Sequence, residues 1–501
     1  MANKTEITLE QIQDFKGKYP KQLWYLFFIE MWERFCFYGN RGMLTIFMVD
    51  VLLLSDKNAN LQYGAIQAFV YAFTFIGGLF ADKILGFQKS LLWGGILMIS
   101  GSVVLGISAE HYFYYGICLL IIGTGFFKPN ISTMVGELYK EGDVRRDAGF
   151  GLFYAGINVG ALLGGAICVY VGKMYTWDLA FLLSGGFMIV GLITFLVTKA
   201  NLGPIGLAPI PAKPTSAKRN QWMVYAGSIL ILPGIYLMIT NTHYTDIFMY
   251  IIGPATLMYL MYEMLKLGWQ ENKKMLAALV FILLSILFWA FFEQSGGSLS
   301  LFAKDNLNSD LLSLKIDPNV INNSSNSLFV IIFSPLIGLL WIWLKRKKIE
   351  PNYFVKFGLA FLFLGGAFYV FYVNRFFAGA DGKTSLLVFT AAYFVISIAE
   401  LFLSPIGLSL MTKLSPKKLW GVMMGLWFLA SAYGQYVAGI LGAGMASPDK
   451  NASATVKLNL YTEGYHQLAI YGIVTGVVVI LVAPFLKKLM RGVINFFIDW
   501  S

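Results

Sequence analysis

Residues 23–53 read LWYLFFIEMWERFCFYGNRGMLTIFMVDVLL and form the first long apolar run of the chain. A bilayer core about 30 Å thick needs about 20 apolar residues per helix, so this run is long enough to cross it. Besides Asp50 near its end, it contains four charged residues further inside, Glu30, Glu33, Arg34 and Arg41. We therefore expect a transmembrane helix whose charged side chains face away from lipid.

The rest of the chain has the same character. Of its 501 residues, 57% are hydrophobic and 13% are charged, and the mean hydropathy is +0.66. Soluble domains are about 45–50% apolar and about 25% charged. Thirteen further apolar runs cover residues 59–81, 90–108, 111–138, 147–172, 178–198, 221–241, 246–267, 274–302, 326–345, 353–373, 385–411, 418–445 and 463–487. The prediction is an all-α membrane protein with fourteen transmembrane helices.

The charges in the loops predict the orientation. With the N-terminus in the cytoplasm, roughly 27 of the 38 Lys and Arg residues lie at cytoplasmic ends of spans and about 8 lie outside. Residues 345–348, all Lys or Arg, are the plainest case. Both termini are therefore expected in the cytoplasm. This placement explains the net charge of +11, and no nucleic-acid partner is expected.

The runs fall into groups of six, two and six. This is the layout of the major facilitator type, in which two bundles enclose a site near the middle of the bilayer. The loop at residues 77–86, GGLFADKILG, resembles the signature loop of that superfamily. The expected parts are a cytoplasmic segment (1–20), an N-terminal six-helix bundle (21–200), a proline-rich linker with two extra helices (201–270), a C-terminal six-helix bundle (271–490) and a cytoplasmic tail (491–501).

Seven charged residues lie deep within these runs. At about 2.5–3.5 kcal/mol each, seven unpaired charges would cost on the order of 20 kcal/mol. They must pair with one another or line a hydrated chamber, or else serve as ion pairs that set helix register. On the first run, residues 30, 33, 34, 37 and 41 fall on one helical stripe. The seven are Glu30, Glu33, Arg34, Arg41, Lys128, Glu293 and Glu400.

Several motifs identify a resemblance. Residues 30–39, EMWERFCFYG, resemble the ExxERFxYYG signature of the proton-dependent oligopeptide transporters. Residues 123–130, GTGFFKPN, are similar to the GTGxxKPN segment of the same family. Further similar segments lie at residues 143–150, 153–160, 288–294, 400–407 and 423–428. The resemblance runs from about residue 24 to about residue 489.

The resemblance implies residue roles in substrate binding. Arg41 and Lys128 would receive the terminal carboxylate of a peptide, and Glu400 would face its ammonium group. Asn158 and Asn326 would hold the peptide backbone. The remaining expected pocket residues are Phe37, Tyr38, Tyr71, Glu293, Ser404 and Trp427.

The resemblance also implies how protons are handled. Glu30, Glu33, Arg34 and Glu293 would couple protons to transport. Two ion pairs, Arg41 with Glu293 and Lys128 with Glu400, would act as alternating gates. This sequence departs from the family pattern at Phe37, where the signature has tyrosine, and at Phe292, where some relatives have a second acid.

The expected function is therefore proton-coupled uptake of di- and tripeptides by alternating access, with the proton as the coupling ion and no other cofactor. A different substrate on the same scaffold remains open, either a small anion such as nitrate or a peptide-like drug. An enzyme is not expected, because the spans hold no nucleophile–base pair and no metal-ligand set. The expected setting is the lipid of a bacterial cytoplasmic (inner) membrane, and the expected state is a monomer.

Overall fold

The computed structural model describes residues 7–209, 214–403 and 408–490. Almost all of these residues are helical, and the described strands, β1 (Asp310–Leu311) and β2 (Leu314–Lys315), form one short antiparallel hairpin. The predicted all-α fold class is confirmed. The chain divides into two compact units, unit 1 (residues 1–47 and 69–240) and unit 2 (residues 48–68 and 241–501).

The first group of helices follows the predicted runs closely. After the short α1 (Leu9–Gln13), the long helices are α2 (Lys21–Asp50), α3 (Asp56–Phe80), α4 (Phe87–Ile107), α5 (Ala109–Glu137), α6 (Arg145–Met174) and α7 (Trp177–Thr198). A π-helical turn, η1 (Ala81–Leu85), continues α3, and the 3-10 turn η2 (Lys199–Leu202) follows α7.

Glycines let neighbouring helices of unit 1 approach closely. A Cβ atom on Gly101 of α4 would lie 2.7 Å from the carbonyl oxygen of Gly116 on α5, and one on Gly123 would lie 2.8 Å from that of Gly94. Small residues at helix interfaces are the usual means of packing in a membrane, where burial of apolar surface gives no preference for helix over lipid. α4 and α5 therefore pack backbone against backbone.

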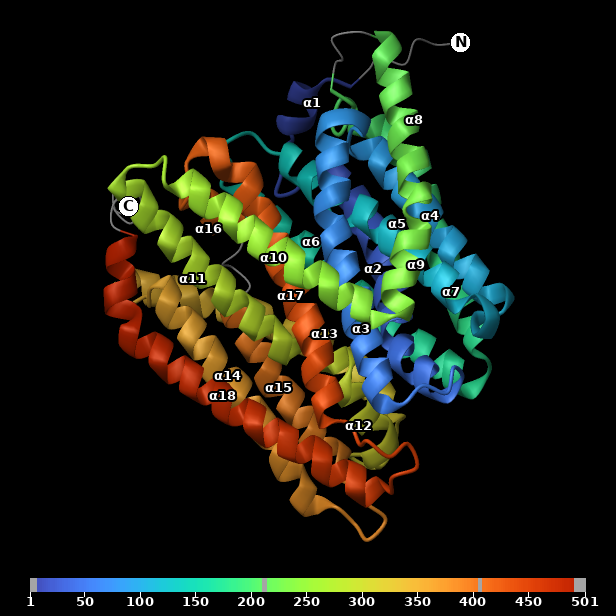
Figure 1. The fold of residues 1–501 in the computed structure, drawn as a ribbon. Coiled ribbons are helices and arrows are strands. Elements are labelled where there is room, and N and C mark those ends of the chain that lie inside the picture. The colour runs from blue at the N-terminus through green and yellow to red at the C-terminus, as the bar shows by residue number, and fades with distance from the viewer. Residues whose placement is uncertain (1–6, 210–213, 404–407, 491–501) are drawn as a thin grey trace. The chain divides into compact units, whose positions relative to one another are not determined.

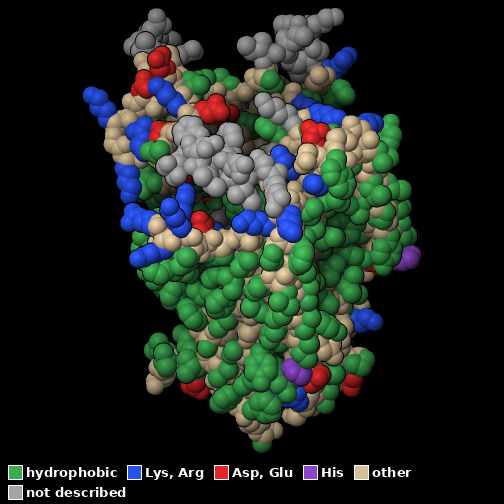
Figure 2. All heavy atoms as spheres, turned by 90° about the vertical axis from the view of Figure 1, so that its left-hand side faces the viewer, with side chains coloured by type: hydrophobic (Ala, Val, Ile, Leu, Met, Phe, Trp, Pro, Cys, Tyr) green, Lys and Arg blue, Asp and Glu red, His purple; other side chains and the backbone are tan. Residues whose placement is uncertain are grey.

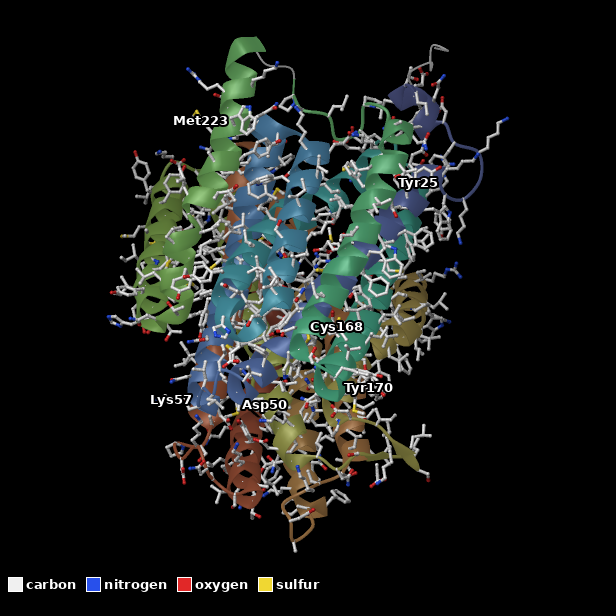
Figure 3. All side chains as sticks on the ribbon, turned by 90° about the vertical axis from the view of Figure 1, so that its right-hand side faces the viewer. Tyr25, Asp50, Lys57, Cys168, Tyr170 and Met223 are labelled. Carbon is white, nitrogen blue, oxygen red and sulfur yellow. The ribbon has the colours of Figure 1, made fainter. Side chains whose placement is uncertain are left out.

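The two extra helices attach to different units. α8 (Pro214–Leu230) and α9 (Leu232–Thr240) pack in unit 1, where Trp93 Nε1 donates to Ser228 Oγ at 3.0 Å. Met223 on α8 is exposed and apolar, as expected for a lipid-facing position (Figure 3). α10 (Thr242–Met264) packs in unit 2, where the Tyr436 hydroxyl donates to Asp246 Oδ1 at 2.6 Å.

The second group comprises α11 (Trp269–Phe292), η3 (Glu293–Gly296), α12 (Ser298–Asn306), α13 (Pro318–Arg346), α14 (Tyr353–Val373), η4 (Asn374–Phe377), α15 (Leu386–Leu403), α16 (Leu408–Lys413), η5 (Lys417–Leu419), α17 (Trp420–Met445) and α18 (Ala454–Leu489). Within unit 2, α14 and α18 lie side by side (Figure 1). Their contact belongs to a continuous hydrophobic core that also includes residues of α11, α15 and α17.

Some predicted boundaries are wrong. The runs expected at 326–345 and 463–487 belong to helices that start at Pro318 and Ala454, because Asp317 and Ser453 cap these helices and polar residues extend them beyond the apolar stretch. The run expected at 274–302 is interrupted at Glu293. The predicted span 385–411 includes residues 404–407, which lie outside the described residues.

Twelve helices in the described ranges are long and apolar enough to cross a membrane. α2 and α17 have 30 and 26 residues, so they are also long enough, although the charges of α2 and the glycines of α17 make them less apolar. The twelve and these two together match the fourteen predicted runs. Figure 2 shows one broad hydrophobic face with Lys and Arg gathered toward one end. Within unit 2, the apolar residues Leu339 and Leu481 are exposed, and so are the basic residues 345–348.

Candidate functional site

The signature stripe on α2 forms a buried ion-pair triad. Glu30, Glu33 and Arg34 are each at most 1% exposed. Arg34 Nε lies 3.2 Å from Glu30 Oε1 and also pairs with Glu33 Oε2. Two carboxylates and one guanidinium leave one surplus negative charge if all three are ionised. Of the seven charges that the sequence places deep within the runs, these three pair with one another.

Two glycines of α6 allow this helix to pack closely against α2 beside the triad. A Cβ atom on Gly160 would lie 2.9 Å from Arg34 Cβ, and one on Gly164 would lie 2.8 Å from the Cα of Phe35. α6 therefore approaches the main chain of α2 closely beside the triad. Larger side chains at these two positions would push α2 away. Asn158, on the same helix, is buried and donates through Nδ2 to the Tyr154 carbonyl at 2.9 Å.

Aromatic rings connect the triad to Lys128 of α5. The ring of Phe37 lies 5.0 Å from Arg34 Cζ and 5.8 Å from Lys128 Nζ. Lys128 Nζ also lies 4.4 Å from the ring of Tyr71 on α3. Contacts between a cation and an aromatic face contribute about 0.5–2 kcal/mol, most when water is excluded. The ring of Phe37 therefore lies beside two cations. These contacts use the face of the ring and involve no hydroxyl group.

Arg41 and Tyr38 continue this constellation one turn further along α2. The guanidinium carbon of Arg41 lies 5.6 Å from the ring of Tyr38. The ring of Tyr38 lies 5.1 Å from the ring of Phe37. Six of the predicted residues of unit 1 thus lie in one connected set around α2, α3 and α5: Arg34, Phe37, Tyr38, Arg41, Tyr71 and Lys128.

Three residues of the GTGFFKPN segment, Gly125, Pro129 and Asn130, shape α5 around Lys128. A Cβ atom on Gly125 would lie 2.6 Å from the Phe73 carbonyl oxygen, so α3 and α5 touch here. Pro129 has no N–H and leaves a carbonyl of the preceding turn without its helical donor. Asn130 Nδ2 donates to the Phe126 carbonyl at 2.7 Å and to Ser90 Oγ at 2.8 Å. The segment of α5 that carries Lys128 therefore packs against α3 through Gly125 and bonds to α4 through Asn130.

In unit 2, two predicted residues pair directly. Asn326 Nδ2 donates to Glu400 Oε2 at 2.9 Å and to Ser397 Oγ at 3.1 Å. Sequence reasoning missed Ser397, although it precedes Glu400 by three residues and must share its face of α15. Trp427 is half-buried against the hydrophobic core of unit 2. The prediction for Ser404 falls outside the described residues.

Glu293 lies at the interruption between α11 and α12. It is 4% exposed, and the chain leaves the α-helix at this residue for a single 3-10 turn. The two predicted gates join Arg41 and Lys128 of unit 1 to Glu293 and Glu400 of unit 2. Both gates remain predictions.

Sequence reasoning also missed a polar cluster in unit 2. Lys457 Nζ lies 2.6 Å from Asp305 Oδ2 and 3.2 Å from Asp56 Oδ2, and the Tyr461 hydroxyl donates to Asp56 at 3.1 Å. These side chains are buried or nearly so. Nothing in the sequence signals the cluster, because its members lie at span ends where charged residues are common.

Neither metal ligation nor disulfide chemistry is offered by the described residues. No group of three or more His, Cys, Asp or Glu side chains in residues 7–209, 214–403 and 408–490 is arranged to hold a metal ion. Cys36, Cys118 and Cys168 are buried free thiols, the last of them on α6 (Figure 3). The site consists of paired charges, amides and aromatic rings.

Comparisons with known proteins agree with this architecture. The model of the POT family matches residues 88–458. The transporter YclF of Bacillus subtilis is 32% identical over 488 residues, 95% of this chain and 96% of the relative. The peptide transporter YePEPT of Yersinia enterocolitica is 32% identical over 449 residues, 85% of this chain and 88% of the relative. The dipeptide and tripeptide permease B of Aliivibrio fischeri is 28% identical over 474 residues, 94% and 95% of the two chains.

Solved structures match over nearly the whole chain. A crystal structure of a peptide transporter POT with sulfate superposes with a TM-score of 0.82 at 31% identity, covering 97% of this chain and 100% of that chain. A point mutant of a peptide transporter POT in complex with alafosfalin gives the same TM-score at 30% identity and the same coverage.

Proposed function

Because this chain belongs to the POT family of membrane transporters, we propose that it carries di- and tripeptides into the cell together with protons, by alternating access. The names of its relatives, peptide transporter and dipeptide and tripeptide permease, support a peptide as the substrate. The main observation behind the proposal is that cations and a carboxylate of the predicted site lie in different units. The cations Arg41 and Lys128 lie in unit 1, and the amide-paired carboxylate of Glu400 lies in unit 2.

We propose that these groups bind the two ends of one peptide. Arg41 and Lys128 bind the terminal carboxylate, and Glu400 binds the terminal ammonium while Asn326 holds the backbone. Opposite charges on separate units would recognise the length of a zwitterion and leave its side chains free to vary. Rings such as Tyr38 and Tyr71 provide surfaces on which different side chains can rest.

We propose that carboxylates take up the coupling proton. With Glu293 ionised, its pairing with Arg41 closes one side of the transporter, and protonation of Glu293 releases Arg41 to the peptide. Lys128 and Glu400 close the other side in the same way. The triad of Glu30, Glu33 and Arg34 has one surplus negative charge, so uptake of one proton makes it neutral. An inward proton contributes about 2.3 kcal/mol per 100 mV of membrane potential.

A peptide-like drug is the second candidate substrate. Solved structures of a peptide transporter POT include one in complex with alafosfalin and one in complex with sulfate, and these complexes support considering substrates other than di- and tripeptides. A small anion such as nitrate is the other alternative, and dependence of uptake on Glu400 separates it from a peptide, because a small anion has no ammonium group for that carboxylate to bind. Uptake of a labelled peptide-like drug, compared with that of dialanine, tests the drug.

The test is uptake into liposomes containing the purified protein. Radiolabelled dialanine should accumulate with an inward proton gradient and should not accumulate without one. Glu293→Gln should abolish gradient-driven accumulation, while counterflow of labelled against unlabelled dialanine survives. Unchanged uphill uptake in this variant would reject Glu293 as the proton site.

We further propose that the protein works as a monomer in the bacterial cytoplasmic membrane with both termini inside. Residues 345–348, which are exposed and all basic, would then lie in the cytoplasm. A cysteine placed at Lys347 should be labelled by an impermeant thiol reagent in inside-out vesicles only. Labelling in intact spheroplasts would contradict the orientation.

A further inference from the structure

The interruption after Glu293 is held by neutral amide and hydroxyl groups from three helices of unit 2. Asn322 Nδ2 of α13 donates to the Ser295 carbonyl at 2.8 Å, and the Tyr393 hydroxyl of α15 donates to Asn322 Oδ1 at 2.6 Å. Both polar ends of Asn322 are thus used. Asn322 is 2% exposed and Tyr393 is 1% exposed.

A second set of bonds joins the turn to α11, α12 and α17. Gln294 Nε2 donates to the Ala290 carbonyl of α11 and to the Ala438 carbonyl of α17, each at 3.0 Å. Its Oε1 atom accepts from the Ser298 hydroxyl at 2.7 Å. An interrupted helix within a membrane leaves carbonyls without helical donors, and such carbonyls need partners from protein or water. The side-chain amides supply those partners.

Glu293 is the residue from which this turn begins. Gly297, which ends the turn, has φ −107° and ψ −106°, so the direction of the chain changes within five residues of Glu293. The bonds that Asn322 and Gln294 make to the turn therefore constrain the backbone directly after Glu293. Neutral amides neither gain nor lose a proton near pH 7, so they can hold the turn equally well whether or not Glu293 is protonated.

We propose that Asn322 and Tyr393 are positioning residues for Glu293, acting through the Ser295 carbonyl to keep the carboxylate where it exchanges its proton. This inference rests on the proposed role of Glu293 as the proton site. Loss of the Tyr393 hydroxyl should therefore impair proton exchange at Glu293 and should leave peptide binding unchanged.

The variant Tyr393→Phe tests the proposal with little change in packing, since the ring keeps its contacts with Phe371 and Phe389 at centroid distances of 5.8 and 5.3 Å. It should lower gradient-driven accumulation of dialanine about three- to tenfold, the loss expected for one buried neutral hydrogen bond. The pH midpoint of uptake should move by about half a unit. Counterflow should stay within about twofold of the unsubstituted protein.

Thr390→Val is the matched control. Thr390 lies one turn before Tyr393 on α15, and its hydroxyl donates within its own helix, to the Leu386 carbonyl at 2.8 Å. Its removal should leave accumulation and the pH midpoint unchanged. Asn322→Leu removes both bonds and should exceed the effect of Tyr393→Phe, provided that the variant folds.

The double variant with Glu293→Gln separates positioning from general damage. If Tyr393 acts through Glu293, adding Tyr393→Phe to Glu293→Gln changes neither counterflow nor its pH dependence. A further loss of counterflow in the double variant, or unchanged accumulation and midpoint in Tyr393→Phe alone, would overturn the inference. Persistent uphill uptake by Glu293→Gln alone would instead overturn the proposed function.

Discussion

Glu400→Gln is the most informative single substitution for the proposed binding mode. Glutamine keeps the shape and an acceptor oxygen, so the bond from Asn326 Nδ2, 2.9 Å long in the structure, can persist in neutral form. The substitution therefore removes one negative charge and leaves the local fold intact. It should weaken binding of the peptide ammonium specifically.

The size of the effect follows from the surroundings of Glu400. Two opposite charges about 4 Å apart attract by about 4 kcal/mol at an effective dielectric constant near 20. Glu400 is partly exposed, so desolvation and water reduce the net gain to about 1.5–3 kcal/mol, the range for hydrogen bonds to charged groups. The dissociation constant of a peptide with a free amino terminus should rise about 10- to 150-fold.

Competition for dialanine counterflow in liposomes measures this effect. Dialanine should lose affinity in Glu400→Gln, whereas N-acetyl-dialanine, which has no ammonium group, should bind the variant and the unsubstituted protein equally weakly. Glu463→Gln, the same chemical change on the exposed side chain that pairs with Arg375 at 3.4 Å, should alter neither affinity. Equal losses for both peptides, or none for dialanine, would refute the assignment of Glu400.

Three further predictions concern stability, each measured as an apparent Tm in detergent. Lys457→Gln removes the cation paired with Asp56 and leaves Asp305 only the longer contact with Lys304 at 3.8 Å, so it should destabilise unit 2 by about 3–5 kcal/mol, whereas Lys315→Gln, at an exposed ion pair, should cost at most about 1 kcal/mol; similar shifts for both would contradict the burial argument. Gly125→Ala should lower the Tm because its Cβ would lie 2.6 Å from the main chain of α3, while Gly186→Ala, with open space around it, should not; a neutral Gly125→Ala would mean that the helices can separate freely. The hydrogen bond from Arg145 holds the pKa of the Asp143 carboxyl below its usual range, so the stabilising contribution of this carboxylate is present above about pH 4 and is lost as the pH falls through the lowered pKa. Asp143→Asn should therefore lower the Tm at pH 7 and have a smaller effect at about pH 3. A difference in Tm that does not depend on pH would count against this linkage.

Much of the candidate site could be predicted from the sequence because its charges are conspicuous. A charged residue in an apolar run is costly unless it is paired, so Glu30, Glu33 and Arg34 indicate a buried cluster without any knowledge of the fold. The pairing of Asn326 with Glu400 is different. Seventy-four residues separate the two, and only the packing of α13 on α15 brings them to 2.9 Å.

The hydrogen bonds at the interruption of α11 could not be predicted in the same way. Asn322 and Gln294 are ordinary polar residues in the sequence, and the run at 274–302 is apolar enough for a continuous helix. Only the structure shows that the helix is interrupted at Glu293, and therefore which carbonyls lack helical donors. The role of Phe37 also depends on the fold, since the two cations beside its ring come from different helices.

By itself, the sequence determined the number of spans, because the free energy of placing a helix in lipid is a sum over consecutive residues and needs no partner. It did not determine where α13 and α18 begin, because their polar first turns are stabilised by capping and by neighbouring helices. It did not determine which charges meet at Lys457 either. Tertiary structure decided those contacts, since each depends on how helices far apart in the chain cross one another.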